Sequence, residues 1–453
     1  MRFAAVLLLL PAAVTADSRW PSFQNGGAVS LADVDAGPWL AGVKTEWTAD
    51  VPGHGQASPV VWDDRLYVTS TIGDMKEQYR LTCLSTTDGK ELWAQTFENP
   101  TPKPNNLYTS RAAPTPAADE SGVVVFFEGG VLASFTHEGS PRWQRNLVDE
   151  FGGDDTRFGQ SGSVEQEGDV GFLWFARQSG DYVLAFDKQS GETVWKVDGP
   201  GVTSWASPRL VPLKDGSKHL VLSGGGKIAG LAPEDGSTLW TADGLAGNTT
   251  PTPVPMGDGR FLIGASQGRG EISESDAAGS NAVFQILVDG DGFRAEKVWG
   301  ADRATSSFGT PIVHNGRAWI VNRSGVLYVL DAASGEKQAT SRLSGSIWAT
   351  PVGLGDTVLF PTKDGALDFV SAGEGETQLT YQVLPDSDAS SQGDGERDSE
   401  RDGGRDGGRD GGRGGNGGRG GNFGGATLYG VALTDGRLYV RDGDHVYCVV
   451  PAG

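Results

Sequence analysis

The chain has few of the residues from which most catalytic and metal sites are built. Its 453 residues include two cysteines and five histidines, and it contains no Gly-x-Ser-x-Gly, His-Glu-x-x-His or phosphate-loop motif. The histidines lack the spacing of metal ligands, and each is typical of a surface or turn position. The sequence therefore predicts no metal site and offers no motif for a catalytic nucleophile.

Basic residues are also scarce relative to acidic ones. The chain has 37 Lys and Arg against 58 Asp and Glu, a formal net charge of -21. A charge of this sign disfavours nucleic acid and anionic membranes as partners. We expect a monomer whose partner is another protein or a small anionic ligand.

Long apolar segments are absent except at the N-terminus. Residues 1–16 combine Arg2, a short apolar run and small residues ending at Ala16, as in a cleaved secretory signal peptide. The run is too short to span a bilayer as a helix. The sequence predicts a secreted or periplasmic protein that does not cross the membrane, and no Cys follows the expected cleavage point to carry a lipid anchor.

A repeated unit is the main positive feature of the sequence. Residues 307–337 predict three short antiparallel strands at 310–313, 318–321 and 326–330, with a tight turn at Asn315-Gly316. Similar units elsewhere continue into a fourth strand that contains a tryptophan, namely Trp93, Trp143, Trp195 or Trp240. A four-stranded sheet that recurs every forty to fifty residues or so must bury its faces against its copies, as the blades of a β-propeller do.

The number of such units predicts eight blades. First strands are expected at residues 58–61, 114–116, 161–164, 207–210, 250–253, 310–313, 350–352 and 430–432. The last unit lacks a fourth strand, and residues 44–48 resemble a fourth strand that lacks the other three. We therefore predict an all-β, eight-bladed β-propeller of four-stranded antiparallel blades, its ring closed by N- and C-terminal strands. Seven blades remain an alternative, because the third unit is the weakest match.

The two cysteines occupy equivalent places in this scheme. Cys83 and Cys448 both fall in third strands. Equivalent positions of neighbouring blades lie roughly 10 Å or more apart, beyond the reach of a disulfide. We favour two buried free thiols over a disulfide.

Two segments do not follow the repeat. Residues 17–43 are expected to be irregular and to lie over a face of the propeller, which itself spans residues 44–453. Residues 385–425, rich in Gly, Arg and Asp, form an insertion between the seventh and eighth blades that contains almost no apolar residues. We expect this insertion to be disordered. A polyanion-binding role for it is disfavoured because its acidic residues nearly cancel its arginines.

The repeat motifs resemble those of a known family. The Ser/Thr-Pro-Val first strand, the third strand Gly325-Val-Leu-Tyr-Val-Leu-Asp331 and the Ser/Thr-Gly-x-x-x-Trp closure are similar to the pyrroloquinoline-quinone (PQQ)-like repeats. Such repeats occur in quinoprotein alcohol dehydrogenases and in an outer-membrane assembly lipoprotein. The resemblance covers nearly all of residues 47–450 and implies a propeller. It does not extend to the adjacent cysteine pair or the calcium ligands of the dehydrogenases, nor to the N-terminal Cys of the lipoprotein.

A candidate binding site follows from propeller geometry. The segments that enter first strands and the turns between second and third strands lie on the same face, where we predict a basic, aromatic-lined funnel. The candidate cofactor- or ligand-binding residues are Arg111, Arg177, Trp205, Lys227, Phe308, Arg323, Trp348 and Lys363. Their cations suit a carboxylate-bearing ligand such as PQQ, and a tryptophan would stack on it. The alternative is that these side chains only form turns and fill the ring.

Three functions are weighed on this basis. The leading hypothesis is an exported ligand- or protein-binding scaffold, active in assembly, without an intact dehydrogenase site. The second is a PQQ-dependent oxidoreductase with a divergent site, in which Arg323 and Lys363 hold the cofactor. The third is recognition of a peptide or polysaccharide at the channel mouth.

Overall fold

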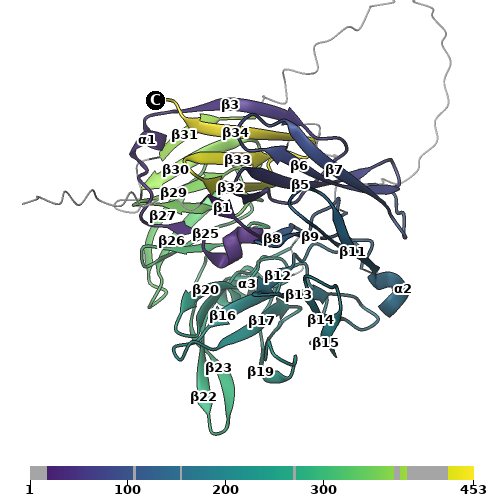
Figure 1. The fold of residues 1–453 in the computed structure, drawn as a ribbon. Helices are drawn as coiled ribbons and strands as arrows, with labels where there is room; N and C mark the ends of the chain where they lie inside the picture. The colour runs from purple at the N-terminus through teal and green to yellow at the C-terminus, as the bar shows by residue number, and fades with distance from the viewer. Residues whose placement is uncertain (1–17, 106–108, 154–155, 269–271, 372–377, 385–426) are drawn as a thin grey trace, which may run out of the picture.

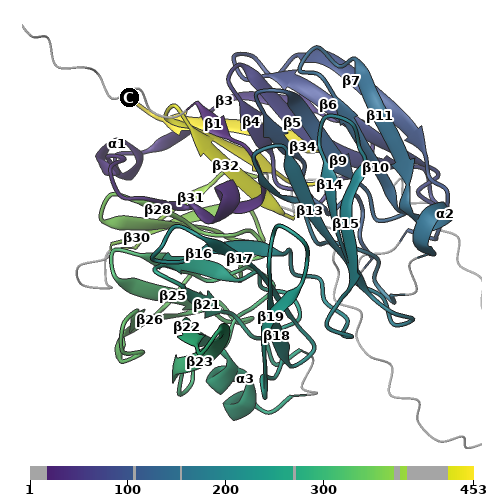
Figure 2. The same cartoon turned by 60° about the horizontal axis from the view of Figure 1, so that its bottom comes forward.

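The structure, a computed structural model, describes residues 18–105, 109–153, 156–268, 272–371, 378–384 and 427–453. The predicted signal peptide at residues 1–16 and the predicted insertion at residues 385–425 lie outside the described residues. The described chain forms eight antiparallel sheets arranged in a ring (Figures 1 and 2). The prediction of an eight-bladed β-propeller is therefore confirmed.

Each blade has four strands, which follow chain order from the axis outward in blades 1 to 7. Blade 1 contains β4 (Val60–Trp62), β5 (Arg65–Ile72), β6 (Gln78–Ser85) and β7 (Glu91–Glu98). Blade 2 contains β8 (Ala117–Asp119), β9 (Gly122–Phe126), β10 (Val131–Phe135) and β11 (Pro141–Asn146). Blade 3 contains β12 (Glu165–Glu167), β13 (Val170–Phe175), β14 (Tyr182–Asp187) and β15 (Thr193–Asp198). Blade 4 contains β16 (Arg209–Pro212), β17 (Lys218–Gly224), β18 (Lys227–Leu231) and β19 (Thr238–Asp243).

The second half of the ring repeats this order. Blade 5 contains β20 (Val254–Gly257), β21 (Arg260–Ile263), β22 (Ala282–Asp289) and β23 (Gly292–Gly300). Blade 6 contains β24 (Ile312–His314), β25 (Arg317–Val321), β26 (Val326–Asp331) and β27 (Lys337–Arg342). Blade 7 contains β28 (Val352–Leu354), β29 (Thr357–Pro361), β30 (Ala366–Ser371) and β31 (Gln378–Gln382). Blade 8 contains β32 (Gly430–Thr434), β33 (Arg437–Arg441), β34 (His445–Pro451) and β3 (Val43–Asp50).

Blade 8 joins the two ends of the chain. β3 pairs antiparallel with β34, and Trp47 lies opposite Cys448 in the register. Figure 1 shows the purple strand β3 beside the yellow strands of the C-terminal region. The predicted closure of the ring by N- and C-terminal strands is confirmed, and it leaves no open edge between the first and last blades.

A chain of hydrogen bonds links the blades around the axis. The backbone N–H groups of Ser58, Thr115, Ser163, Ser207 and Thr252 each donate to the hydroxyl of the corresponding residue in the next blade, at 2.9–3.2 Å. These are the Ser and Thr residues that mostly precede proline. The Ser/Thr-Pro motif therefore forms hydrogen bonds between blades rather than hydrogen bonds between the strands of one sheet.

Because the Ser/Thr-Pro residues bond the next blade, several first strands begin later in the chain than predicted. The strands expected at 114–116, 161–164 and 250–253 begin instead at Ala117, Glu165 and Val254. Proline has no N–H to donate to a ladder. Pairing within the sheet therefore begins only after the residues that form the inter-blade bonds.

Tryptophans in the outer strands join neighbouring blades. Trp93 Nε1 donates to the carbonyl of His137 at 2.8 Å, and its ring packs on Gly139 in the turn that follows β10. The contact recurs at Trp47 with Gly89, Trp143 with Gly191, Trp195 with Gly236 and Trp299 with Gly335. These tryptophans therefore pack between neighbouring blades. Trp240 differs, because its Nε1 donates to His219 Nδ1 at 2.9 Å.

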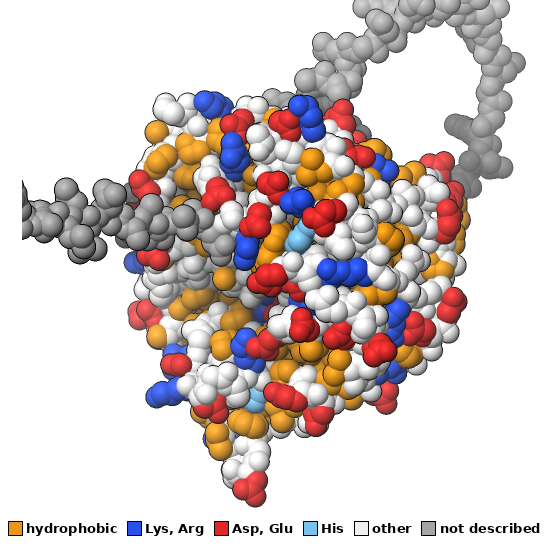
Figure 3. Space-filling model, viewed as in Figure 1, with side chains coloured by type: hydrophobic (Ala, Val, Ile, Leu, Met, Phe, Trp, Pro, Cys, Tyr) orange, Lys and Arg blue, Asp and Glu red, His pale blue; other side chains and the backbone are white. Residues whose placement is uncertain are grey.

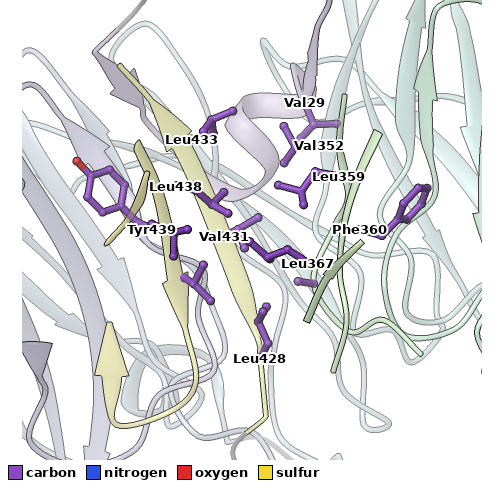
Figure 4. Close-up of a cluster of buried hydrophobic side chains, with 14 of the residues drawn as sticks. Val29, Val352, Leu359, Phe360, Leu367, Leu428, Val431, Leu433, Leu438 and Tyr439 are labelled. Atoms are coloured by element: carbon purple, nitrogen blue, oxygen red, sulfur yellow. The ribbon is translucent and has the colours of Figure 1, made fainter. Parts of the chain in front are cut away.

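The apolar core lies between successive sheets. Figure 4 shows part of the largest cluster, in which Val352 and Leu367 of blade 7 face Val431 and Leu438 of blade 8. Val29, from the N-terminal segment, packs into the same cluster. Short helices lie at the periphery: α1 (Gly37–Leu40), α2 (Leu147–Phe151) and α3 (Glu274–Ser280). None of the helices in the described part of the chain has the length and apolar character that crossing a membrane requires.

The N-terminal segment crosses one end of the channel. β1 (Arg19–Trp20) adds to β4 of blade 1, and β2 (Ser30–Leu31) runs parallel to β28 of blade 7. Between them, η1 (Phe23–Gly27) is anchored by Gln24, which donates to Thr350 at 3.0 Å. Gln24 also accepts a bond from the buried Arg209 at 3.1 Å. Because Arg19 bonds Asp63 in the turn between β4 and β5, this segment lies on the face opposite the predicted funnel.

Candidate functional site at the channel mouth

The face that carries the predicted funnel is called the mouth face here. It is formed by the segments that enter the innermost strands and by the turns between second and third strands of each blade. The N-terminal segment covers the other end of the channel. The exterior shows no broad basic area on the face drawn in Figure 3, where acidic and basic side chains are interspersed.

Three aromatic side chains from successive blades form a row on the mouth face. The rings of Phe308 and Trp348 meet edge to face at 5.5 Å, and Trp348 lies 5.9 Å from the ring of Tyr429. Lys363 Nζ lies 5.4 Å from the centre of the Trp348 ring, within the range of a cation–π contact. Phe308 is 50% exposed although it is a large hydrophobic residue. We call Phe308, Trp348 and Tyr429 the aromatic row.

Arg111 contacts Tyr429, the residue at one end of the aromatic row. Its Nη2 donates to the hydroxyl of Tyr429 at 3.1 Å, while its backbone exchanges hydrogen bonds with Gln56. Burial lowers the pKa of Arg111 below its usual value, and the Tyr429 hydroxyl partly opposes that shift. The structure thus brings together four of the predicted residues: Arg111, Phe308, Trp348 and Lys363.

The other four predicted residues make local contacts elsewhere on this face. Trp205 donates to the carbonyl of Gly159, Arg177 to those of Phe151 and Gly180, and Arg323 to that of Gly268. Lys227 is exposed. None of the contacts recorded for the described residues connects these four side chains to the aromatic row. Four of the eight predicted residues therefore form one cluster, and the role of all eight in ligand binding stays a prediction.

Two further residues of the cluster, Arg441 and His54, were not predicted from the sequence. Arg441, at the end of β33, is fully buried, and its three guanidinium nitrogens have no hydrogen-bond partner among the described residues. The ring of His54 lies 5.6 Å from that of Tyr429, and its Nε2 is likewise buried without a partner in the described chain. Burial, with the charges of Arg111 and Arg441, lowers the pKa of His54 to about 4. Arg441 falls on the same strand face as the buried Tyr439, a pattern that could have marked it as inward-facing.

A buried ion pair holds the Arg111 segment in place. Lys76 Nζ lies 3.3 Å from Glu128 Oε1, and both side chains are almost completely buried. The ammonium also donates to the carbonyl of Ser110 at 2.8 Å. Glu128 Oε2 accepts the N–H of Ala112 at 3.1 Å. The residues on both sides of Arg111 are therefore fixed by one charged pair.

An open cleft lies beside the cluster at the junction of blades 8 and 1. It has a volume of about 670 Å³ and is lined by residues that include His54, Asp74, Asp444 and His445. Asp442, Asp444 and His445 present ligand atoms within 4.8 Å of one another, so their donor types could hold a cation. Asp442 already accepts bonds from the Tyr447 hydroxyl and the N–H of His445. The sequence pointed to no such group, because only one of its members is a histidine.

Two other histidines are not where the sequence placed them. His219 and His314 are buried, each with less than 3% of its surface exposed, and not at surface or turn positions. His314 bonds Ser30 and the carbonyl of Gly355, so it ties the N-terminal segment to blade 7. Burial lowers the pKa of both rings. The expectation that all five histidines lie at surface or turn positions is therefore wrong.

The two cysteines lie away from the aromatic row. Cys83 in β6 and Cys448 in β34 are both buried free thiols, as expected. Burial raises the pKa of both to about 12, so they stay protonated at neutral pH.

The chain is similar in sequence to one family of known proteins. The family model for outer membrane protein assembly factor BamB matches residues 41–170, 159–289 and 294–397. The chain is 23% identical over 260 residues to BamB of Yersinia pestis, covering 57% of this chain and 60% of that protein. It is 25% identical over 197 residues to BamB of Escherichia coli (strain K12), covering 43% of this chain and 47% of the relative. The matches thus span less than two thirds of these relatives.

Solved structures share the fold at low identity. BamB from Moraxella catarrhalis has a TM-score of 0.56 and 13% identity, covering 90% of this chain and 98% of that one. A europium-containing methanol dehydrogenase has a TM-score of 0.53 and 12% identity, covering 82% of this chain and 86% of the other. These likenesses concern the fold alone. A quinoprotein cofactor site with a cysteine pair does not fit this chain, because Cys83 and Cys448 lie in different blades as separate buried thiols.

Proposed function

Because this chain belongs to the family of outer membrane protein assembly factor BamB, we propose that it is a protein-binding scaffold. In this proposal the mouth face binds an extended segment of a partner protein across the aromatic row. The names of the relatives support a role in assembly, and the chemistry of the mouth face supports the site.

The observation that carries this proposal is the partly exposed aromatic row with a cation at its side. Phe308 is half exposed, and Trp348 is held between Phe308, Tyr429 and Lys363. Aromatic residues together with arginine are enriched at the centres of protein interfaces, where they bury large areas at little entropic cost. A row of aromatic rings suits the side chains on one face of an extended chain.

A peptide-binding measurement tests the site. A set of fluorescent ten-residue peptides that alternate apolar and polar residues is titrated with the protein, and binding is followed by anisotropy. Phe308→Ser and Trp348→Leu should weaken binding by about 30-fold or more, as expected for interface residues worth about 2 kcal/mol.

The matched control is Leu92→Ser. Leu92 is 49% exposed, nearly the same as Phe308, but it lies in β7 at the outer edge of blade 1. This variant should bind as the unmodified protein does. Peptides that bind equally to all three variants, or to none of the proteins including the unmodified one, would contradict the proposed site.

We also propose that the protein acts outside the cytoplasm, secreted or in the periplasm. The support is the signal-like composition of residues 1–16. Mass spectrometry of the protein isolated from its native cells should give an N-terminus at or near Asp17. An intact Met1 on the mature protein would refute the export signal.

A further inference from the structure

We infer that the junction of blades 8, 1 and 2 contains a binding site for the carboxylate or phosphate group of a small molecule, formed by Arg441, Arg111, His54 and Tyr429. This site adjoins the surface proposed to bind a partner protein and shares Tyr429 with it. It does not depend on that proposal, because it is argued from the buried nitrogens of Arg441, Arg111 and His54 and not from the exposed Phe308.

Arg441 provides the first argument. A guanidinium carries five N–H donors and no acceptor, so it needs acceptors when it is buried. The nearest acidic groups are engaged elsewhere: Asp442 accepts from His445 and Tyr447, and Asp444 lies 3.1 Å from His445. Burial lowers the pKa of Arg441 to about 10 while the charges of Asp442 and Asp444 oppose that shift, so Arg441 remains charged at neutral pH. A bound oxyanion would supply the acceptors that the described chain does not.

The surrounding residues converge on the same place. Residues 54–56 run between the two arginines, because Gly55 packs against Arg441 and Gln56 bonds the backbone of Arg111. A Cβ on Gly55 would lie 3.0 Å from Arg441 Nη2 and only 1.9 Å from the carbonyl of Thr69, so this approach requires glycine.

Tyr429 contacts the backbone of Arg441 and the side chains of Arg111 and His54. Its N–H donates to the carbonyl of Arg441 at 2.8 Å, its hydroxyl accepts from Arg111 at 3.1 Å, and its ring lies edge-on to His54 at 5.6 Å. Arg111 Nε and His54 Nε2 are buried without partners among the described residues. The charges of Arg111 and Arg441 both act on His54, so the two guanidinium groups lie in the same region of this junction as the imidazole and the phenol.

This combination selects an anion by its chemistry. Charge-assisted bonds from arginine to a carboxylate or phosphate are among the strongest hydrogen bonds in proteins, and a cation would be repelled by both arginines. Trp348 continues the row from Tyr429 at 5.9 Å. An apolar or aromatic body attached to the anionic group would therefore find a surface to lie on.

Ligand-dependent stability tests the site on the complete chain. Sodium acetate, sodium phenylacetate and inorganic phosphate are each compared with sodium chloride at equal ionic strength, by thermal unfolding and by tryptophan fluorescence. A group that binds only the folded protein raises the midpoint of unfolding in a saturable way. Phosphate alone, or the carboxylates alone, would identify the source of the anion. Tighter binding of phenylacetate than of acetate would show that the aromatic row holds the body of the ligand.

Three variants and a control make the test specific. Arg441→Met and Arg111→Gln should each weaken binding at least tenfold, and Tyr429→Phe should do so while keeping the ring. Without ligand, Arg441→Met should unfold at a higher temperature, because an apolar side chain replaces a buried guanidinium that lacks hydrogen-bond partners in the described chain. Arg303→Gln is the control, since Arg303 is 81% exposed.

The outcomes that overturn the inference are clear. One is the absence of any saturable shift beyond that of chloride. The other is a shift of equal size in the control and in the variants of the site. If Arg441→Met fails to fold, Arg111→Gln and Tyr429→Phe decide the question by themselves.

Discussion

The contact between an outer-strand tryptophan and a glycine of the next blade makes a quantitative prediction. Gly139 has φ +83°, and a Cβ added there would lie 2.6 Å from Trp93 Cδ2. The ring cannot retreat without breaking its 2.8 Å bond to the carbonyl of His137. Gly139→Ala should therefore lower the free energy of unfolding by the backbone strain, about 1–2 kcal/mol, plus about 1–3 kcal/mol for overpacking.

Gly316→Ala separates these two contributions. Gly316 has φ +72°, but nothing lies within 4 Å of the added Cβ. This variant has only the strain of a left-handed backbone, about 1–2 kcal/mol. Both substitutions reduce the entropy of the unfolded chain alike, so that effect cancels in the comparison.

Urea unfolding followed by circular dichroism measures the difference between the two variants. Gly139→Ala should be less stable than Gly316→Ala by about 1–3 kcal/mol, the cost of overpacking alone. If the two variants agree within about 0.5 kcal/mol, the tryptophan does not require glycine at this position. The account of how neighbouring blades fit together would then be refuted.

Two further predictions concern buried charge near the mouth face. The folded-state pKa of His54, about 4, lies below the unfolded value of about 6.5, so the unfolded chain binds the proton more tightly. The stability contributed by neutral His54 is complete above pH 6.5 and should fall by about 2–3 kcal/mol as the pH drops to 4. His54→Asn should flatten this part of the stability–pH curve, and parallel curves would contradict the assignment. Lys76→Met leaves Glu128 buried without its partner and should cost about 3–5 kcal/mol in urea unfolding, partly recovered when Glu128→Gln is added. A loss below about 1 kcal/mol would show that this pair does not support the Arg111 segment.

The fold could be predicted because the same pattern of strands and turns recurs eight times in the sequence. Each blade repeats the same turn residues and the same alternation, so one weak copy did not change the count. The strand that contains Trp47 has no other strands of a blade beside it in the sequence, and only the C-terminal unit lacked a fourth strand. Together these two observations indicated that the chain ends close the ring. The beginnings of the first strands were predicted less well. The Ser/Thr-Pro residues bond the next blade, and a pattern of strand propensity cannot distinguish that role from pairing within the sheet.

The candidate site was predicted only in part. Phe308, Trp348 and Lys363 were found because blade geometry places residues at repeat positions on one face. Arg441 and His54 were missed because their importance depends on contacts across the junction of different blades. A sequence pattern shows which face of a strand a residue occupies, but not whether an acceptor from the neighbouring blade reaches it. Burial without a partner is visible only in three dimensions.

The closure of the ring and the inferred anion site are physically connected. His54 and Arg111 come from the first part of the chain, and Tyr429 and Arg441 come from the last blade, whose β34 pairs with β3. Arg441 is a buried charge without a hydrogen-bond partner in the described chain, so it opposes the pairing that joins the chain ends. An anion bound to it would supply the missing acceptors and stabilise the closed ring by mass action. Ligand binding and ring closure should therefore strengthen each other, which gives a reason for a buried arginine at a place where an apolar residue would make the empty protein more stable.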